Sequence, residues 1–251
     1  KLPSDGPEMR AIRGKEIALI FQEPMSSFSH YYTVGNQIME GILLHGTLDR
    51  AAARARAIEL LRLVGVPKPE RRIDEYPFQL SGGLRQRVMI AMSLASDPHV
   101  LIADEPTTAL DVTTQAQILD LMRDLQTKRA LALILITHDM GVIAEMADDV
   151  VVMYLGRAVE TGPVEQIFHD PKHPYTRALL RSIPNVDAQP RERLATMSGA
   201  IPHPFNRPPG CPFHPRCDSA ISGLCDREMP PAIRLPDGRE VACVLHQAEA
   251  A

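Results

Sequence analysis

The sequence of 251 residues contains no tryptophan, few other aromatic residues and no strong excess of either charge. Its formal net charge of -4 gives no sequence-wide reason to expect a nucleic-acid or anionic-membrane partner. No window approaches the roughly 18 consecutive apolar residues of a membrane-spanning helix, and the start KLPSDGPEMR lacks the apolar core of a secretory signal. With 45% hydrophobic residues, the chain can still build one large or two modest globular domains. We therefore expect a soluble, cytosolic protein.

Short apolar runs carry the main structural signal: EIALIF at 16–21, HVLIA at 99–103 and LALILI at 131–136. Because their apolarity is continuous rather than alternating, they predict strands of a parallel sheet covered on both faces. Between the second and third runs, apolar residues recur at helical spacing and predict a crossover helix over 112–128. The predicted fold class is α/β.

The other segments differ in composition. Residues 26–98 hold no strand-like run and predict a helical insertion. Residues 150–160 predict a β-hairpin that turns near Gly156. Proline becomes frequent from Pro163 onward, and the text at 201–217 predicts loops rather than a conventional sheet.

Two adjacent carboxylates, Asp104 and Glu105, stand at the end of the second apolar run. Ligands of open α/β sheets bind at this edge, where one carboxylate can hold a Mg²⁺ that bridges phosphate oxygens while its neighbour polarises an attacking water. The plainer interpretation is that the acidic pair only caps a following turn.

A serine and two glycines, Ser81, Gly82 and Gly83, precede an apolar-periodic helix predicted to start near Leu84. A helix start presents unpaired N–H groups and a positive dipole end, and glycine lets a phosphate approach the backbone closely. Taken alone, Ser81 would be read simply as a helix N-cap.

Several motifs in order are similar to those of ABC ATPases. FQEP at 21–24, LSGGLRQR at 80–87, VLIADEP at 100–106, TALD at 108–111 and ITHD at 136–139 resemble the Q-loop, signature, Walker B, D-loop and H-loop. The resemblance implies an ABC-type P-loop NTPase domain, with a RecA-like parallel sheet core and a helical subdomain, that uses ATP and Mg²⁺.

The resemblance also implies a role for each matching residue. Gln22 contacts the Mg²⁺ and γ-phosphate region and couples to the membrane partner, while Asp104 organises Mg²⁺. Glu105 is the general base, His138 is the γ-phosphate switch, and Asp111 is a contact across a dimer. The signature residues Ser81, Gly82 and Gly83 serve the nucleotide bound to the opposite subunit.

The Gly-rich P-loop, G-x-x-x-x-G-K-[ST], does not occur in the sequence, and GKE at 14–16 is no substitute. In the family this motif precedes the Q-loop, so we expect it upstream of Lys1. Because the other hydrolytic residues are present, we expect an N-terminal truncation rather than a natural pseudo-ATPase.

Longer stretches resemble the ATPase subunits of oligopeptide and dipeptide importers: 9–25, 32–38, HPYTRALLRSIP at 173–184 and CPFHPRC at 211–217. The segment FSHYYTV lacks the Asn-Pro sequence expected at 29–31. This difference bears on the local contacts of the Q-loop and not on the family resemblance. The resemblance implies work at the cytoplasmic face of the inner membrane as a peripheral subunit. Its implied partners are a second, different ABC ATPase subunit in a heterodimer, two permease subunits and an extracytoplasmic solute-binding protein.

The same resemblance divides the chain. Residues 1–25 and 99–162 are expected to form the RecA-like core, 26–98 the helical subdomain with the signature, and 163–251 a small loop-rich C-terminal domain. Two alternative functions for this chain are a non-transport ABC ATPase that acts on DNA or ribosomes, and a non-hydrolysing subunit that completes a partner's ATP site. The acidic balance and the C-terminal text disfavour the non-transport alternative.

All four cysteines lie in the C-terminal region, at Cys211, Cys217, Cys225 and Cys243. Clustered cysteines in proline-rich text of a cytosolic protein indicate a metal more often than disulfides. Four thiolates suit a [4Fe–4S] cluster or a structural Zn²⁺. The spacing matches neither common zinc pairs nor the compact ferredoxin run, and resemblance to the importer family favours iron–sulfur. Zinc and unligated thiols remain the alternatives.

Overall fold

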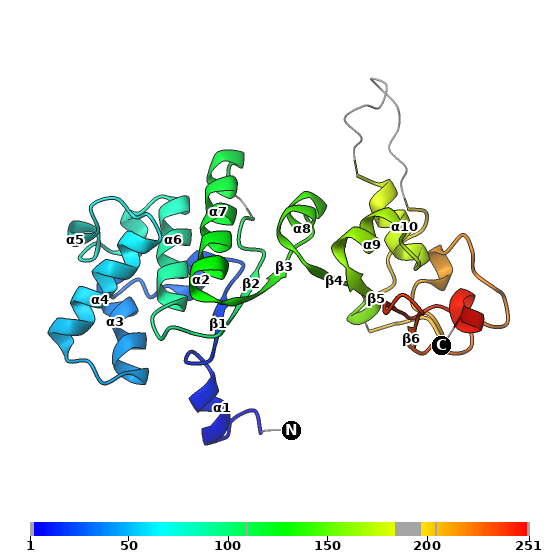
Figure 1. Ribbon diagram of the computed structural model, residues 1–251, viewed down its shortest axis with the longest axis horizontal. Helices are drawn as coiled ribbons and strands as arrows, with labels where there is room; N and C mark the ends of the chain where they lie inside the picture. The colour runs from blue at the N-terminus through cyan, green and yellow to red at the C-terminus, as the bar shows by residue number, and fades with distance from the viewer. Residues whose placement is uncertain (1–2, 109, 184–196, 204, 250–251) are drawn as a thin grey trace. The chain divides into compact units, whose positions relative to one another are not determined.

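The computed structural model describes residues 3–108, 110–183, 197–203 and 205–249 (Figure 1). The chain divides into two compact units, Lys1–His138 and Asp139–Ala251. Each unit has its own sheet, so each is described by itself.

The first unit is built on a parallel sheet of three strands, β1 (Ile17–Ile20), β2 (Val100–Asp104) and β3 (Ala132–Ile136), in the order β1-β2-β3. Helix α7 (Val112–Arg129) connects β2 to β3 and buries an apolar stripe. The strands and the crossover helix confirm the predicted α/β class, and the carboxyl end of β2 carries Asp104.

The segment between β1 and β2 contains only helices among its described residues. They are α2 (Pro24–Ser27), α3 (Val34–His45), α4 (Arg50–Leu63), α5 (Pro69–Arg72), η1 (Pro77–Gln79) and α6 (Gly82–Ser93), while α1 (Pro7–Ile12) precedes β1. Apolar side chains of α3, α4 and α6 such as Ile38, Leu60 and Ile90 are fully buried. Helix α6 begins two residues before the predicted start at Leu84.

The expectation that both faces of this sheet are covered is wrong for the described residues. Burial alternates along β1, with Ala18 and Ile20 buried while Leu19 is 41% exposed. On β3, Ile134 is 51% exposed. A continuous apolar run shows that every residue of a strand tolerates burial. It does not show whether neighbouring elements cover one face of the sheet or both.

The second unit begins with α8 (Met140–Met146) and the predicted hairpin, β4 (Asp149–Tyr154) and β5 (Arg157–Pro163). Leu155 and Gly156 form its turn with φ of 47° and 75°, as a two-residue hairpin loop with the strands' own twist requires. The remaining elements are α9 (Val164–His169), α10 (Pro174–Arg181), η2 (His214–Arg216), β6 (Ile233–Arg234), β7 (Glu240–Val241) and η3 (Val244–Glu249).

The second sheet has the order β4-β5-β7-β6, so short strands from the end of the chain extend the hairpin. The segment 201–217 contributes no strand in its described part, as predicted, whereas β6 and β7 were not anticipated. The core of this unit combines hairpin residues with Ile167 and Phe213, which ties the proline-rich segment to the sheet.

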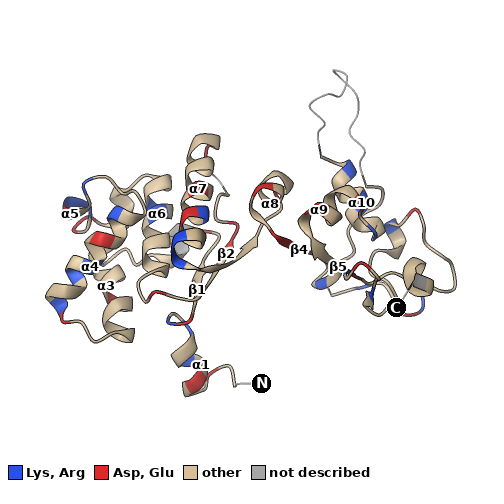
Figure 2. Cartoon of the chain, in the orientation of Figure 1, with Lys and Arg blue, Asp and Glu red and all other residues tan. Residues whose placement is uncertain are grey.

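Basic residues outnumber acidic ones on α4 and α5 (Figure 2). Arg54 pairs with Asp74 at 2.8 Å, and Arg56 pairs with Asp97 at 2.9 Å. The arginine-rich helix is therefore neutralised locally by acidic side chains. No helix within the described ranges has the length and apolarity needed to cross a membrane.

Candidate functional site

Glu105 lies directly after β2, at the carboxyl end of the parallel sheet. Its backbone N–H donates to the carbonyl of Ile136 at 2.8 Å, which continues the pairing of β2 with β3 by one residue. Its φ of 44° is in the left-handed region, which is uncommon for a residue with a β-carbon and concentrates at functional turns. The chain thus adopts a costly backbone conformation at the predicted general base.

Side chains from three separate segments converge on the Glu105 carboxylate. Gln22, which follows β1, donates from Nε2 to Oε2 at 2.8 Å. Thr108, in the turn after β2, donates from Oγ1 to the same oxygen at 2.9 Å. Nδ1 of His138, which follows β3, lies 3.0 Å from Oε1. The structure therefore brings together Gln22, Glu105 and His138, which are 83 and 33 positions apart in sequence.

These contacts favour the ionised form of Glu105. The hydrogen bond with His138 contributes most to holding the pKa of Glu105 below its usual value near 4.5, followed by the hydrogen bond from Thr108. The side chain of His138 is 78% exposed, whereas that of Glu105 is 23% exposed. At neutral pH the carboxylate is an acceptor only, as a group that polarises water must be.

Asp104 is the last residue of β2 and is half-buried. The hydrogen bonds that gather Gln22 and His138 reach Glu105, its neighbour. The adjacent carboxylates therefore differ in their surroundings, which is consistent with separate chemical tasks.

Thr108 is a site residue that sequence reasoning missed, because only Asp111 of the TALD motif was given a role. The backbone N–H of Thr108 donates to the Glu105 carbonyl at 3.1 Å, so the two residues close one turn. A hydroxyl residue three positions after an acidic residue at a strand end is the signal that could have indicated it.

Ser81 occupies the N-cap position of α6 with extended backbone, φ -67° and ψ 163°, but its side chain makes no capping hydrogen bond. Capping alone therefore does not explain this serine. A β-carbon on Gly82 would meet nothing within 4 Å, whereas one on Gly83 would lie 2.8 Å from Cγ2 of Thr114. Gly82 thus leaves the helix start open to a ligand, while Gly83 permits the close approach of α7.

Asp111 is the N-cap of α7. Its carboxylate accepts the backbone N–H of Thr114 at 2.9 Å and the Thr114 hydroxyl at 2.8 Å. Those bonds, the backbone one first, lower the pKa of Asp111 from its usual value near 3.8. Thr114 thus links the D-loop aspartate to the glycine of the signature helix.

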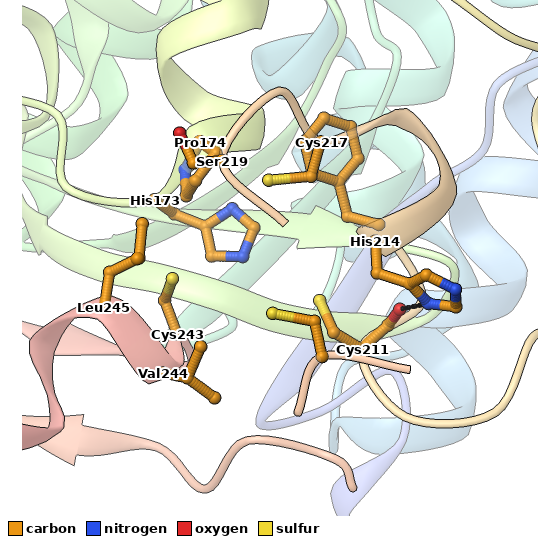
Figure 3. Close-up of a pocket in the computed structure, with 11 residues that line it drawn as sticks. His173, Pro174, Cys211, His214, Cys217, Ser219, Cys243, Val244 and Leu245 are labelled. Atoms are coloured by element: carbon orange, nitrogen blue, oxygen red, sulfur yellow. Dashed lines mark hydrogen bonds between the residues drawn. The ribbon is translucent and has the colours of Figure 1, made fainter. Parts of the chain in front are cut away.

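A second candidate site lies in the other unit, where all four cysteines line one cavity. The cavity holds about 330 Å³ of empty space, part of it open to solvent, and His173 and His214 also line it. Figure 3 shows the thiols of Cys211, Cys217 and Cys243 around the imidazole of His173. None of the cysteines is in a disulfide.

Burial favours the protonated form of three of these thiols, those of Cys211, Cys217 and Cys243. Burial raises the pKa values of Cys211 and Cys217, and it raises that of Cys243 to about 11. Neighbouring thiols add to the increase for each of these groups. Within the described part of the chain, no group of three or more His, Cys, Asp or Glu residues is arranged to hold a metal ion.

Aromatic contacts fix the segments that carry this cavity. Tyr175 lies with its ring centroid 4.7 Å from that of Tyr154 on β4, and 5.4 Å from that of Phe213. The HPYT and CPFHPRC motifs therefore meet on the hairpin. His173 is 1% exposed, and burial lowers its pKa from 6.5 to about 4.

Two family models match the chain. Residues 3–108 match the family described as ABC transporter, and residues 159–225 match the family described as Oligopeptide/dipeptide transporter, C-terminal region. The chain is 53% identical over 236 residues to the dipeptide transport ATP-binding protein DppD of Escherichia coli K12, across 94% of this chain and 72% of that protein. The chain belongs to the family of ATP-binding proteins of dipeptide and oligopeptide ABC transporters.

Two further relatives place it within this ABC family. The oligopeptide transport ATP-binding protein AppD of Bacillus subtilis is 49% identical over 240 residues, across 96% of this chain and 73% of that protein. Among solved structures, the dimeric ATP-binding cassette MJ0796 bound to ADP and Pi is 28% identical with a TM-score of 0.57, and the match covers 64% of this chain and 68% of that one.

Proposed function

We propose that this chain is an ATP-hydrolysing subunit in which Glu105 acts as the general base. The convergence of Gln22, Thr108 and His138 on one ionised carboxylate is the observation that carries the proposal. A positioned carboxylate can accept a proton from the water that attacks the γ-phosphate. His138 then serves the γ-phosphate, since its exposed ring can leave Glu105 without uncovering a buried group.

Asp104 and Gln22 fit the binding of Mg²⁺, which prefers carboxylate and carbonyl oxygens. The Gln22 amide nitrogen already donates to Glu105, so its Oε1 atom is the one suited to a cation. When bound, Mg²⁺ would neutralise charge on the phosphate oxygens. The half-buried Asp104 carboxylate at the strand end is the other donor in this proposal.

The signature residues are proposed to act on the nucleotide of a second ABC subunit. Ser81 keeps its hydroxyl out of the capping interaction, and the space at Gly82 is open. Asp111, at the start of α7, is proposed to contact the partner subunit. We also retain the division into a core of 1–25 and 99–162, a helical subdomain of 26–98 and a C-terminal region of 163–251.

The proposed cargo is a dipeptide or oligopeptide, because the names of the similar proteins describe dipeptide and oligopeptide transport. Family membership supports permease and solute-binding partners in general. The finer proposal is a heterodimer with a second ATPase subunit, two permease subunits and an extracytoplasmic binding protein, with this chain peripheral to the cytoplasmic face of the membrane.

The four cysteines are proposed to hold a [4Fe–4S] cluster. The donor set fits, since four thiols outside disulfides line one cavity. A single Zn²⁺ needs its four ligands about 2.0–2.3 Å from one point, and the described residues contain no such grouping. A [4Fe–4S] cluster is larger than a single ion and is held by four thiolates. Bound to deprotonated thiols, it would stabilise a segment with little apolar core.

Phosphate release by the protein assembled with its partners tests the ATPase assignment. Asp104→Asn should abolish Mg²⁺-dependent turnover, whereas Asp120→Asn on the exposed surface of α7 should leave it unchanged. Equal turnover in both variants would remove Asp104 from the site. If the intact assembly hydrolyses ATP equally well with Glu105 and Asp104 both altered, the chain only completes a partner's ATP site.

Iron, sulfide and zinc analysis of protein purified without oxygen tests the cysteine proposal. We expect a brown protein that contains both iron and sulfide, and loss of both in Cys225→Ala. A colourless preparation with zinc would instead establish the zinc alternative.

A further inference from the structure

His173 is a buried polar side chain that the ATPase chemistry does not use. It is 1% exposed, and it lines the same cavity as the four cysteines. Figure 3 shows its imidazole standing among the thiols of Cys211, Cys217 and Cys243. The position of a buried polar ring beside several cysteine thiols needs a physical explanation, because burying a polar group without a hydrogen-bond partner is unfavourable.

The hydrogen-bond pattern fixes which ring nitrogen of His173 carries the proton. Nδ1 accepts the backbone N–H of Tyr175 at 3.0 Å. A nitrogen that accepts a hydrogen bond carries no proton, so the neutral ring bears its proton on Nε2. Nε2 is therefore the donor atom of this side chain.

The segment that carries His173 is held at its backbone as well. The buried carboxylate of Glu160, on β5, accepts the N–H of Lys172 at 2.7 Å and the N–H of His173 at 2.9 Å. The Tyr175 ring packs against Tyr154 and Phe213. The orientation of the His173 ring is thus fixed by the strand β5, by the hydrogen bond at the start of α10 and by the aromatic core. The supporting residues of a metal site usually orient its ligands in the same way.

We propose that His173 donates its Nε2–H to a sulfur atom of the cysteine-held group and so positions and tunes that group. The inference rests on the proposed cysteine site and adds a residue that is not one of its ligands. A hydrogen bond to sulfur stabilises the form with more negative charge, which is the reduced form of an iron–sulfur centre. His173 therefore raises the reduction potential of the centre.

The test compares His173→Phe and His173→Gln with the parent protein, all complete chains purified without oxygen and reconstituted with Fe²⁺ and sulfide. Phenylalanine keeps a ring but no donor, whereas the glutamine amide can replace the Nε2 donor. His203→Phe is the control, since this exposed histidine lies outside the cavity. The readouts are iron and sulfide per chain, the midpoint potential, and the deuterium sensitivity of the iron–sulfur stretching bands.

We expect every variant to bind iron and sulfide. In His173→Phe the reduction equilibrium should shift about tenfold toward the oxidised form, or about 59 mV for a one-electron couple, with loss of the deuterium effect. His173→Gln should restore at least part of the potential and of the deuterium effect, and His203→Phe should match the parent.

An unchanged potential and deuterium effect in His173→Phe would overturn the inference. Loss of iron in both His173 variants, with His203→Phe loaded, would overturn it in favour of direct ligation. A parent protein that binds no iron would refute the cysteine proposal itself.

Discussion

The amide of Gln22 donates to the carboxylate of Glu105 over 2.8 Å, although the two residues are 83 positions apart in sequence. The contact joins the ends of β1 and β2, which are neighbours in the parallel sheet. A change in the position of Gln22 therefore alters the hydrogen bonding of Glu105, the proposed general base. This geometry gives a route by which a partner that contacts the Q-loop can influence hydrolysis.

Thr108 donates a hydrogen bond to the same oxygen of the Glu105 carboxylate as Gln22 does. Thr108→Val has nearly the same shape but no donor, so we expect ATP turnover to fall about fivefold, as for loss of one hydrogen bond of about 1 kcal/mol. Thr108→Ser keeps the hydroxyl and should retain the parental rate. Steady-state phosphate release measures both, and equal rates in the two variants would show that Thr108 has no positioning role.

Gly83 and Gly82 should respond differently to alanine. Gly83→Ala places a β-carbon against the Thr114 methyl and should lower the free energy of unfolding by about 1–3 kcal/mol. Thr114→Ser removes that methyl, keeps the hydroxyl that bonds Asp111 and should restore stability in the double variant. Denaturant unfolding measures this interaction, and additive effects would contradict it.

Gly82→Ala is the complementary variant, since its β-carbon would have open space. Stability should be unchanged, but nucleotide-driven association with the second subunit should weaken because the β-carbon occupies the proposed phosphate approach. Association measured by light scattering with ATP, at the level of the parent, would argue against this role.

Arg239 organises the second unit, with a side chain that is 2% exposed. It donates to Asp237 at 2.6 Å, to the Asp170 carboxylate at 3.0 Å and to the Asp170 carbonyl at 2.6 Å. Arg239→Met leaves these acceptors without their partner and should destabilise the unit by about 2–4 kcal/mol. Arg234→Met, on the exposed position of β6, is the matched control.

The same cluster predicts a pH dependence. The hydrogen bond from Arg239 lowers the pKa of Asp237, and the hydrogen bonds from Lys172 and then Arg239 lower that of Asp170, both from about 3.8. Groups with depressed folded pKa values stabilise the fold above the unfolded pKa, and this contribution is lost as pH falls through the folded values. Unfolding measured from pH 7 to pH 2 should therefore lose less stability in Arg239→Met than in the parent. An identical slope would contradict this coupling.

Gly210 tests the architecture of the cysteine cavity. Its φ is 70°, and a β-carbon there would overlap the Cys225 carbonyl oxygen, which accepts the Cys211 N–H at 2.8 Å. Gly210→Ala should separate these backbones and reduce the iron retained per chain. Gly223→Ala shares a positive φ but has open space, so it should retain iron. Equal iron in both would show that the Cys211 to Cys225 pairing is not needed.

The sequence predicted the strands that end at Asp104 and before His138 because short apolar runs and crossover periodicity are local signals. It also predicted the hairpin at Gly156. It did not predict Thr108, Glu160 or Arg239, whose roles arise from contacts that form only after folding. The open face beside Leu19 was missed for a related reason, since apolarity does not reveal which elements cover a strand.

ATP turnover and ATP binding by Glu105→Gln, in the protein assembled with its partners, test the central claim most directly. Glutamine keeps the size of the side chain but cannot accept the proton of the attacking water. We predict that turnover is abolished while ATP binding is preserved. Turnover at the parental rate would contradict the assignment of Glu105 as the general base.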